Sequence, residues 1–307
     1  MIDFSKKPLF LAPLAGFSDL PLRSVVKKFG CDVTVSEMIS ANALVYESSD
    51  KTLEMIKKSP NEDPYVVQIA GSDIENIKKA VQIINKFDGI YGLDLNCGCP
   101  VPKVVRQGAG SALLNDLDKL QSIISAIKSV SNKKSLSVKF RLGFNDKNEE
   151  KIAKACEEAG ADYIAVHGRT RAGGYSAKVD YEAIARVKAS VKIPVVANGD
   201  INAQNADEIL NLTKCDALMI GRASIGNPWI FHEIKTKTSV DKALKQEIIL
   251  AHFDAMIEHY GEHGLCIFRK HLHQYSKGID GATTFRNDVN FIKDVTAMRE
   301  RIREFFV

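Results

Sequence analysis

The sequence of 307 residues predicts an α/β fold, namely a (β/α)8 TIM barrel followed by a small C-terminal helical domain. Three observations support this prediction. Eight short apolar runs alternate with eight amphipathic segments, polar or glycine residues follow nearly every run, and helical patterns alone continue after about residue 237. Short runs rich in Val, Ile, Leu and Ala are typical of parallel strands buried on both faces. Their even alternation with helices favours a closed barrel over an open sheet.

The expected elements follow from this periodicity. The strands are expected at 9–14, 33–36, 65–69, 90–95, 136–140, 163–166, 193–197 and 217–220. The barrel helices are expected at 20–29, 51–57, 74–87, 117–130, 149–158, 181–189, 203–212 and 225–235. Three more helices are expected at 242–260, 267–277 and 287–306. We therefore predict a catalytic barrel over residues 1–236 and a helical domain over residues 237–307.

Composition excludes several classes of protein. The hydrophobic fraction is 45% and the charged fraction is 26%, as in ordinary globular proteins. Residues 1–10 do not resemble a signal peptide, and no apolar stretch is long enough to cross a bilayer. We therefore expect a cytoplasmic protein, a monomer with no membrane partner. The net charge of +4 supports a nucleic-acid partner only weakly, because many enzymes without a polyanionic substrate carry as much.

The cysteines indicate neither disulfides nor a metal. They are scattered, and a chain of this length does not need covalent cross-links. Cys97 and Cys99 form a lone C-x-C, without the second Cys or His pair that a zinc site requires. We expect no metal and mostly reduced, structural thiols. The six cysteines are Cys31, Cys97, Cys99, Cys156, Cys215 and Cys266.

The residues that follow the predicted strands are candidates for an active site, because barrels of this type carry their sites at the carboxyl ends of the strands. These positions hold mostly polar, charged or glycine residues, which a barrel kept for stability alone would not need. They include Pro13, Leu14, Ala15, Gly16, Glu37, Gln68, Asn96, Cys99, Lys139, Arg141, His167, Asn198, Gly199, Asp200, Gly221 and Arg222.

Two glycine turns follow the last two predicted strands. Loops at this place commonly bind a phosphate through backbone N–H groups, and glycine lets the backbone come close. Arg222, which follows Gly221, adds a planar charge suited to phosphate. The alternative is that Gly199 and Gly221 only allow tight turns.

Lys139 lies on a strand that is otherwise apolar. A lysine that points into a barrel is costly without an anionic partner, and a reduced flavin would be such a partner. Alternatively, the side chain extends to water. Gln68 has an amide donor and acceptor suited to the edge of a heterocycle. His167 contacts either a ligand or the core.

Cys99 lies just after the fourth predicted strand. An unperturbed thiol has a pKa of about 8.5 and is mostly protonated at neutral pH, so Cys99 could donate a proton. A nucleophilic role and an inert thiol are the alternatives.

Motifs along almost the whole chain resemble the tRNA-dihydrouridine synthase family, in consistent order. The segment from Asn96 to Pro100, with Lys103-Val104 after it, is the most specific of them. The family often has Met where Leu14 and Cys97 stand, and both replacements keep an apolar side chain. The matching motifs are Ala12-Pro13-Leu14-Ala15-Gly16, Gln68-Ile69-Ala70-Gly71, Asn96-Cys97-Gly98-Cys99-Pro100, Lys139-Phe140-Arg141, His167-Gly168-Arg169, Asn198-Gly199-Asp200, Gly221-Arg222-Ala223 and Arg269-Lys270-His271.

The resemblance implies FMN as cofactor, NAD(P)H as electron donor and a uridine of tRNA as substrate. It implies that Cys99 is the general acid and that Asn96 and Arg169 lie near the substrate. Arg141 and the basic motif Arg269, Lys270 and His271 would contact RNA. The implied flavin contacts are Pro13, Leu14, Ala15, Gln68, Lys139, His167, Asn198, Gly199, Asp200, Gly221 and Arg222.

Two other functions remain open. An FMN barrel acting on a free pyrimidine would explain the flavin residues but not the basic motif or the added helices. An RNA-binding barrel without catalysis would need neither Cys99 nor Lys139.

Overall fold

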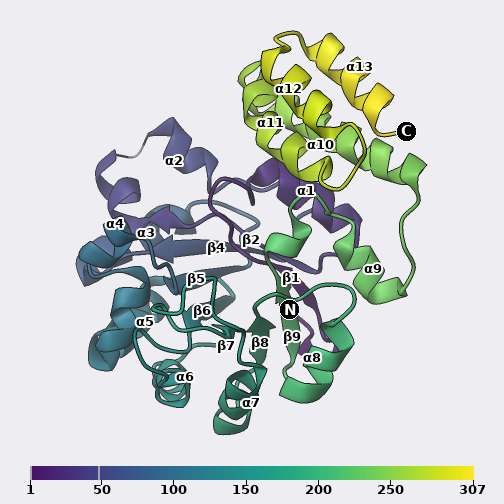
Figure 1. Ribbon diagram of the computed structural model, residues 1–307. Coiled ribbons are helices and arrows are strands. Elements are labelled where there is room, and N and C mark those ends of the chain that lie inside the picture. Colours follow the sequence, from purple (N-terminus) through teal and green to yellow (C-terminus); the bar gives the residue numbers. More distant parts are fainter. Residues whose placement is uncertain (1, 48) are drawn as a thin grey trace.

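The computed structural model describes residues 2–47 and 49–307 and contains a closed parallel barrel (Figure 1). In this part of the chain, β1 pairs with β9 and β2 pairs with β4, so that eight strands form a ring. The short β3 pairs only with the end of β4 and adds no member to the ring. The predicted fold is thereby confirmed. The strands are β1 (Leu9–Leu11), β2 (Val33–Val35), β3 (Ile39–Ser40), β4 (Tyr65–Ala70), β5 (Gly92–Cys97), β6 (Ser135–Arg141), β7 (Tyr163–His167), β8 (Val195–Asn198) and β9 (Ala217–Ile220).

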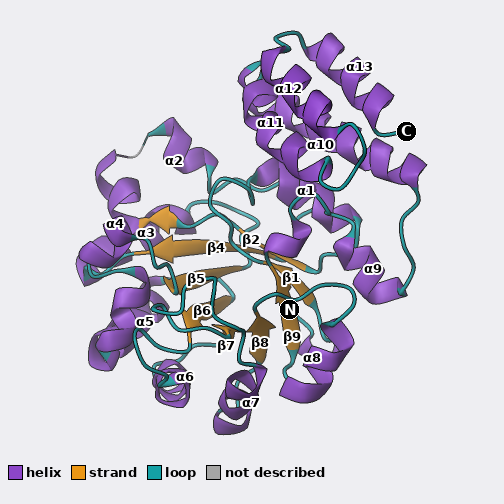
Figure 2. Cartoon of the chain, viewed as in Figure 1, coloured by secondary structure: helices purple, strands orange, loops and turns teal. Residues whose placement is uncertain are grey.

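Helices surround the barrel (Figure 2), and several begin at an aspartate. Asp19, Asp73 and Asp180 each accept a hydrogen bond from a backbone N–H in the first turn of the helix that follows. Such caps satisfy donors that the helix itself leaves free. The barrel helices are α1 (Leu20–Lys28), α2 (Asp50–Glu54), α3 (Ile74–Asn85), α4 (Pro102–Arg106), α5 (Leu117–Val130), α6 (Glu149–Glu158), α7 (Tyr181–Ser190), α8 (Ala206–Thr213) and α9 (Ile230–Thr236). The short α4 was not predicted.

Strand side chains alternate between two cores. On β1, Leu9 and Leu11 pack in the layer between strands and helices, whereas Phe10 packs inside the barrel. On β4, Val66 lies inside while Val67 and Ile69 lie outside. Because the side-chain period of a strand is two, this alternation fixes which polar residues can face the barrel axis.

Four further helices form a bundle beside α1, at the upper right of Figure 1. Their apolar cluster includes Phe253, Phe268 and Phe285, and it also takes in Val25 of α1 and Trp229. The division into a barrel over residues 1–236 and a helical domain over residues 237–307 stays a prediction. The bundle helices are α10 (Lys242–Tyr260), α11 (His263–Tyr275), α12 (Ala282–Phe291) and α13 (Val295–Phe305).

The prediction of a single helix over 287–306 is wrong. The backbone is extended at Ile292, and α12 ends there. Asp294 then caps α13 by accepting a hydrogen bond of 2.8 Å from Ala297 N.

Among the described residues, no helix is long and apolar enough to cross a membrane.

Candidate active site at the carboxyl end of the barrel

Strand alternation brings most of the candidate residues together at the carboxyl ends of the strands, here called the mouth. Neighbouring strands place these residues in register, with Asn96 beside Lys139 and Arg141 beside His167. His167 in turn lies beside Asn198. The intervening residues of each strand, such as Val138 and Phe140, pack outward against helices. Predicted positions far apart in sequence thus form one surface.

A chain of hydrogen bonds crosses three strands inside the mouth. Gln68 Nε2 donates to Asp94 Oδ2 over 2.7 Å, and Asn96 Nδ2 donates to Gln68 Oε1 over 2.8 Å. Ser137 Oγ donates to the other oxygen of Asp94 over 2.6 Å. Burial raises the pKa of Asp94. Asp94 was not among the predicted site residues, although a carboxylate at an inward position of an apolar strand is a usable signal.

The same series of hydrogen bonds holds the Cys99 loop in place. Asn96 Oδ1 accepts hydrogen bonds from Gly98 N (3.1 Å) and Cys99 N (2.9 Å). Gly110 has φ of +60°, and a Cβ there would lie 2.9 Å from Cys99 O. The loop is therefore fixed from the strand and from the segment beyond it, with the side chain of Cys99 partly exposed.

Cys97 lies on the opposite face of its strand from Asn96. Its side chain is fully buried in the outer layer, and burial raises its thiol pKa well above the ordinary value. The two thiols of the C-x-C segment are thus separated, and only Cys99 is accessible at the mouth.

Lys139 points into the mouth without a partner. Its Nζ forms no hydrogen bond or ion pair with any described residue, although the side chain is half-buried. Burial and, to a smaller extent, the positive charge of Arg141 lower the pKa of Lys139 to about 8, whereas the carboxylate of Asp94 opposes this shift. This ammonium group is free to bind an anion.

Asp200 joins two arginines across the turns after β7, β8 and β9. Its carboxylate accepts hydrogen bonds from Arg169 Nη2 and Arg222 Nη2. The hydrogen bond from Arg169 is the main cause that lowers the pKa of Asp200. Burial lowers the pKa of the adjacent His167 to about 2, so its imidazole is neutral and serves as a hydrogen-bonding group.

The glycines of these turns differ in how strictly they are required. Gly199 has φ of +128°, and a Cβ there would lie 3.0 Å from Val179 and 3.1 Å from His167. At Gly221, a Cβ would meet Ala12 at 3.7 Å and Leu14 at 3.9 Å, which is ordinary contact. Gly199 is buried and Gly221 is half-buried, so of these two turns it is the one after β9 that leaves backbone partly accessible beside the first loop, where the lack of a side chain lets a ligand come close.

Four more candidates fit this surface. The side chains of Pro13 and Leu14 are partly exposed and that of Ala15 is exposed, and Leu14 N donates to Ser18 Oγ over 2.7 Å. Asn198 Nδ2 donates to Met219 O over 2.8 Å. The first loop offers an apolar rim, whereas Asn198 is held by the neighbouring strand.

Arg141 is buried and serves as a brace. It donates to Gly98 O, Thr170 O and Gly174 O over 2.9 to 3.1 Å. Its guanidinium also lies 5.3 Å from the ring centre of Tyr175, while that of Arg222 lies 4.7 Å from the same ring. Tyr175 is 56% exposed. Sequence reasoning missed this aromatic residue, whose only signal is its place in a glycine-containing loop.

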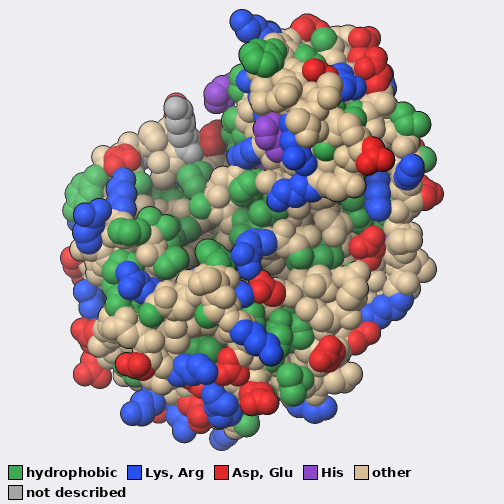
Figure 3. Space-filling view, in the orientation of Figure 1, with side chains coloured by type: hydrophobic (Ala, Val, Ile, Leu, Met, Phe, Trp, Pro, Cys, Tyr) green, Lys and Arg blue, Asp and Glu red, His purple; other side chains and the backbone are tan. Residues whose placement is uncertain are grey.

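The basic motif of α11 is divided by the structure. Lys270 Nζ lies 5.4 Å from the ring centre of Phe17, beside the first loop of the mouth. Arg269 donates to Ile292 O over 2.9 Å, within the bundle. His271 is 1% exposed and presents almost no surface to a ligand. Blue side chains in Figure 3 lie along the seam between bundle and barrel.

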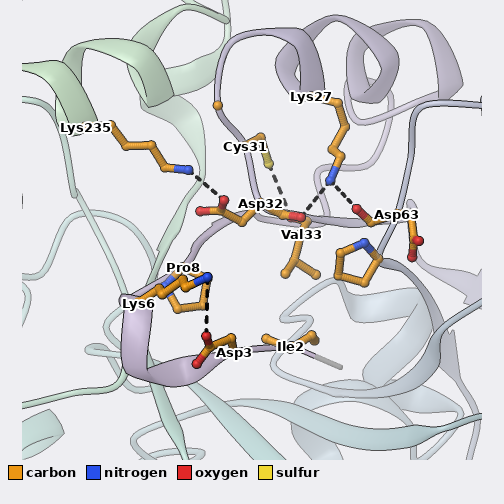
Figure 4. Close-up of a pocket in the computed structure, with 12 residues that line it drawn as sticks. Ile2, Asp3, Lys6, Pro8, Lys27, Cys31, Asp32, Val33, Asp63 and Lys235 are labelled. Atoms are coloured by element: carbon orange, nitrogen blue, oxygen red, sulfur yellow. Dashed lines mark hydrogen bonds and ion pairs between the residues drawn. The ribbon is translucent and has the colours of Figure 1, made fainter.

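The other end of the barrel carries a cavity of about 420 Å³ (Figure 4). It is lined by Lys27, Asp32 and Lys235, among others, and by none of the candidate site residues. Lys235 Nζ lies 2.6 Å from Asp32 Oδ1, and Lys27 donates to two backbone carbonyls. Both lysines thus have partners in the cavity wall, as is usual for the stabilising end of a barrel.

Fold and mouth together define an α/β-barrel enzyme with a free lysine, an accessible thiol and turns suited to phosphate. The dihydrouridine synthase (Dus) family model matches residues 10–306. The chain belongs to this family.

Similar proteins include a "Probable tRNA-dihydrouridine synthase" of Helicobacter pylori strain J99, which is 51% identical over 99% of this chain and 94% of its own length. A "tRNA-dihydrouridine synthase B" of Pseudomonas syringae pv. tomato is 38% identical over 97% of this chain and 91% of its own. Among solved structures, the old yellow enzyme from Trypanosoma cruzi aligns with a TM-score of 0.58 at 10% identity, covering 76% of this chain and 89% of that one. At this identity the likeness concerns the fold alone.

Proposed function

We propose that this protein is an FMN-dependent tRNA-dihydrouridine synthase of the cytoplasm, which reduces the C5=C6 bond of uridines in tRNA with NAD(P)H as electron donor. The observation that carries the proposal is that the mouth contains both an accessible thiol and an unpartnered lysine. Asn96 fixes the backbone of the Cys99 loop, and Lys139, on the adjacent strand, has no partner among the described residues. Family membership and the names of the similar proteins support the choice of substrate.

The residues of the mouth fit FMN. The unpartnered ammonium of Lys139 suits an anionic ring edge, and the Gln68 amide suits the edge of a heterocycle. The glycine turns at Gly199 and Gly221, with Arg222, suit a phosphate. FMN bound there would supply the hydride for C6 of the uracil. The remaining proposed contacts are Pro13, Leu14, Ala15, His167, Asn198 and Asp200.

The chain's own residues supply the rest of the reaction. The uridine must leave the folded tRNA to enter the mouth, which is the usual solution for chemistry on a base. Cys99 gives its proton to C5, so that one hydride and one proton complete the reduction. Asn96 holds the backbone of the Cys99 loop. Arg169 is proposed beside the substrate, with Arg141 as a brace for the surrounding loops.

The contact with tRNA is proposed to extend onto the bundle. Lys270 is the member of its motif that adjoins the mouth. Arg269 is proposed to contribute charge from behind it, while the buried His271 would act through packing.

Substitution of Cys99 tests the proposal. Cys99→Ala is expected to leave reduction of the flavin by NAD(P)H near wild type and to slow its reoxidation by tRNA. Loss of a positioned general acid typically costs about 10²–10⁴-fold. Stopped-flow absorbance of the flavin separates the two half-reactions.

Cys97→Ala is the matched control, because that thiol is buried on the outer side of the strand. It should reduce activity only modestly, through packing. A silent Cys99→Ala, or a Cys97→Ala that abolishes tRNA reduction, would overturn the assignment of the acid. Reduction of free uridine as fast as tRNA would instead favour the small-molecule alternative.

A further inference from the structure

Three polar side chains meet under the seam between barrel and bundle, outside the active site. Asp19 begins α1, His252 belongs to α10 and His271 belongs to α11. They are 5%, 0% and 1% exposed. One potential ligand atom from each lies within 4.8 Å of the others.

The two imidazoles have unpartnered atoms. Nε2 of His252 and Nε2 of His271 are both buried without a hydrogen-bond partner. A buried polar atom without a partner destabilises the folded state. No hydrogen bond joins these three side chains to one another in the described part of the chain. Both rings pack against Phe268, but this packing leaves their Nε2 atoms without a hydrogen-bond partner.

We propose that Asp19, His252 and His271 bind a structural divalent metal ion of the zinc type, which fastens the bundle to the first loop of the barrel. Two imidazole nitrogens and one carboxylate oxygen form a known ligand set for Zn²⁺, with water or another donor in the fourth position. Ligand atoms of a tetrahedral zinc site lie about 3.3 Å apart, given zinc–ligand distances of about 2.0–2.1 Å. Small side-chain rotations would contract the present cluster to that size.

The surrounding hydroxyl groups suit this role. His252 Nδ1 lies 2.9 Å from Tyr275 Oη. When Nδ1 donates its proton there, Nε2 carries the lone pair and is the nitrogen that can bind a cation. Tyr260 Oη donates to Asp19 Oδ2 over 3.2 Å. Metal-binding histidines and carboxylates are typically oriented by such outer hydrogen bonds.

The charges near the cluster also allow a cation. Burial keeps both imidazoles neutral by lowering their pKa values, that of His252 to about 3. Burial raises the pKa of Asp19 to about 6 and the negative charge of Glu37 adds to this rise, so a bound cation would stabilise its carboxylate. Lys270 opposes a cation, whereas the charge of the nearby Arg23 is compensated by Glu62 at 2.7 Å.

Metal content tests this inference independently of catalysis. The full-length protein is stripped with a chelator, dialysed against Zn²⁺ and analysed by mass spectrometry. About one ion per chain is expected, with an increase in the unfolding temperature. Co²⁺ in place of Zn²⁺ should give ligand-field absorption at wavelengths beyond those of oxidised flavin. Failure of the wild-type protein to retain Zn²⁺ would overturn the proposal, whatever its activity.

Variants locate the ion. His252→Gln and His271→Gln should each abolish stoichiometric binding, and Tyr275→Phe should weaken it by about 10–100-fold. Asp19→Asn keeps a good helix cap and serves if the histidine variants do not fold. His273→Gln, two residues from His271 on the same helix, is the control and should bind normally.

A Cys266→Ser background removes the exposed thiol as a competing ligand. Binding that persists unchanged in His252→Gln, His271→Gln and Asp19→Asn would place the ion elsewhere and contradict the inference.

Discussion

The two ends of the barrel differ in whether their lysines have partners. At the end that carries the cavity, Lys235 pairs with Asp32, and Lys27 donates to the carbonyls of Asp32 and Asp63. At the mouth, Lys139 has no partner among the described residues, although it is half-buried. Partial burial of an unpaired charge is costly. The lysine contacts at the cavity end stabilise the fold, whereas the ammonium group of Lys139 at the mouth gains a partner only when a ligand is bound.

Removing the unpartnered lysine should have the largest effect in this comparison. Lys139→Ala is expected to weaken FMN binding and to slow flavin reduction by about 10²–10³-fold, the usual loss for one preorganised electrostatic group. Flavin occupancy and stopped-flow reduction are the measurements. Lys235→Ala, at the paired end, should leave both unchanged. Normal occupancy, reduction and turnover in Lys139→Ala would contradict the role of this lysine.

The glycine turns of the mouth offer a second contrast. Gly199→Ala should destabilise the fold by about 1–3 kcal/mol, because its φ is positive and the space is filled. Gly221→Ala should cost less, since an added Cβ meets only ordinary contacts. Chemical denaturation of the cofactor-free proteins measures both. Equal losses in the two variants would show that the close approach at Gly199 is not limiting.

The pH dependence of stability should also reveal Lys139. Its pKa is about 8 in the folded protein and about 10.4 when unfolded. Between these values the unfolded chain binds more protons, so this group makes the free energy of unfolding rise with pH. Wild type should therefore gain stability relative to Lys139→Ala from pH 7 to pH 10. Urea midpoints of the cofactor-free proteins test this, and parallel pH profiles would refute it.

The smallest effect concerns RNA. Lys270→Ala should lower the salt dependence of tRNA binding by about one slope unit, as expected for one lost phosphate contact. Adding Arg269→Ala should change the slope less, because Arg269 is held by Ile292 O inside the bundle. The rate of flavin reduction should not respond. Binding titrations at several salt concentrations measure the slope; an unaltered slope in the double variant would mean that this motif only stabilises the helix.

The barrel and most residues of the mouth could be predicted from sequence patterns alone. Strand residues alternate with period two, and active sites of such barrels lie at the strand ends. Reading the positions near and after the end of each apolar run therefore found Gln68, Asn96, Cys99, Lys139 and His167. The same period would also have identified Asp94 as inward-facing and Cys97 as outward-facing.

Features that depend on contacts between distant segments could not be predicted from the sequence and required the three-dimensional structure. The sequence presents Arg269, Lys270 and His271 as one basic motif, but packing of α11 leaves Lys270 alone beside the mouth. Likewise, no spacing rule for metal ligands could connect Asp19 with His252 and His271. These residues meet because α1 packs against α10 and α10 packs against α11. Periodicity describes each element separately, whereas the packing of whole helices decides which side chains share a volume.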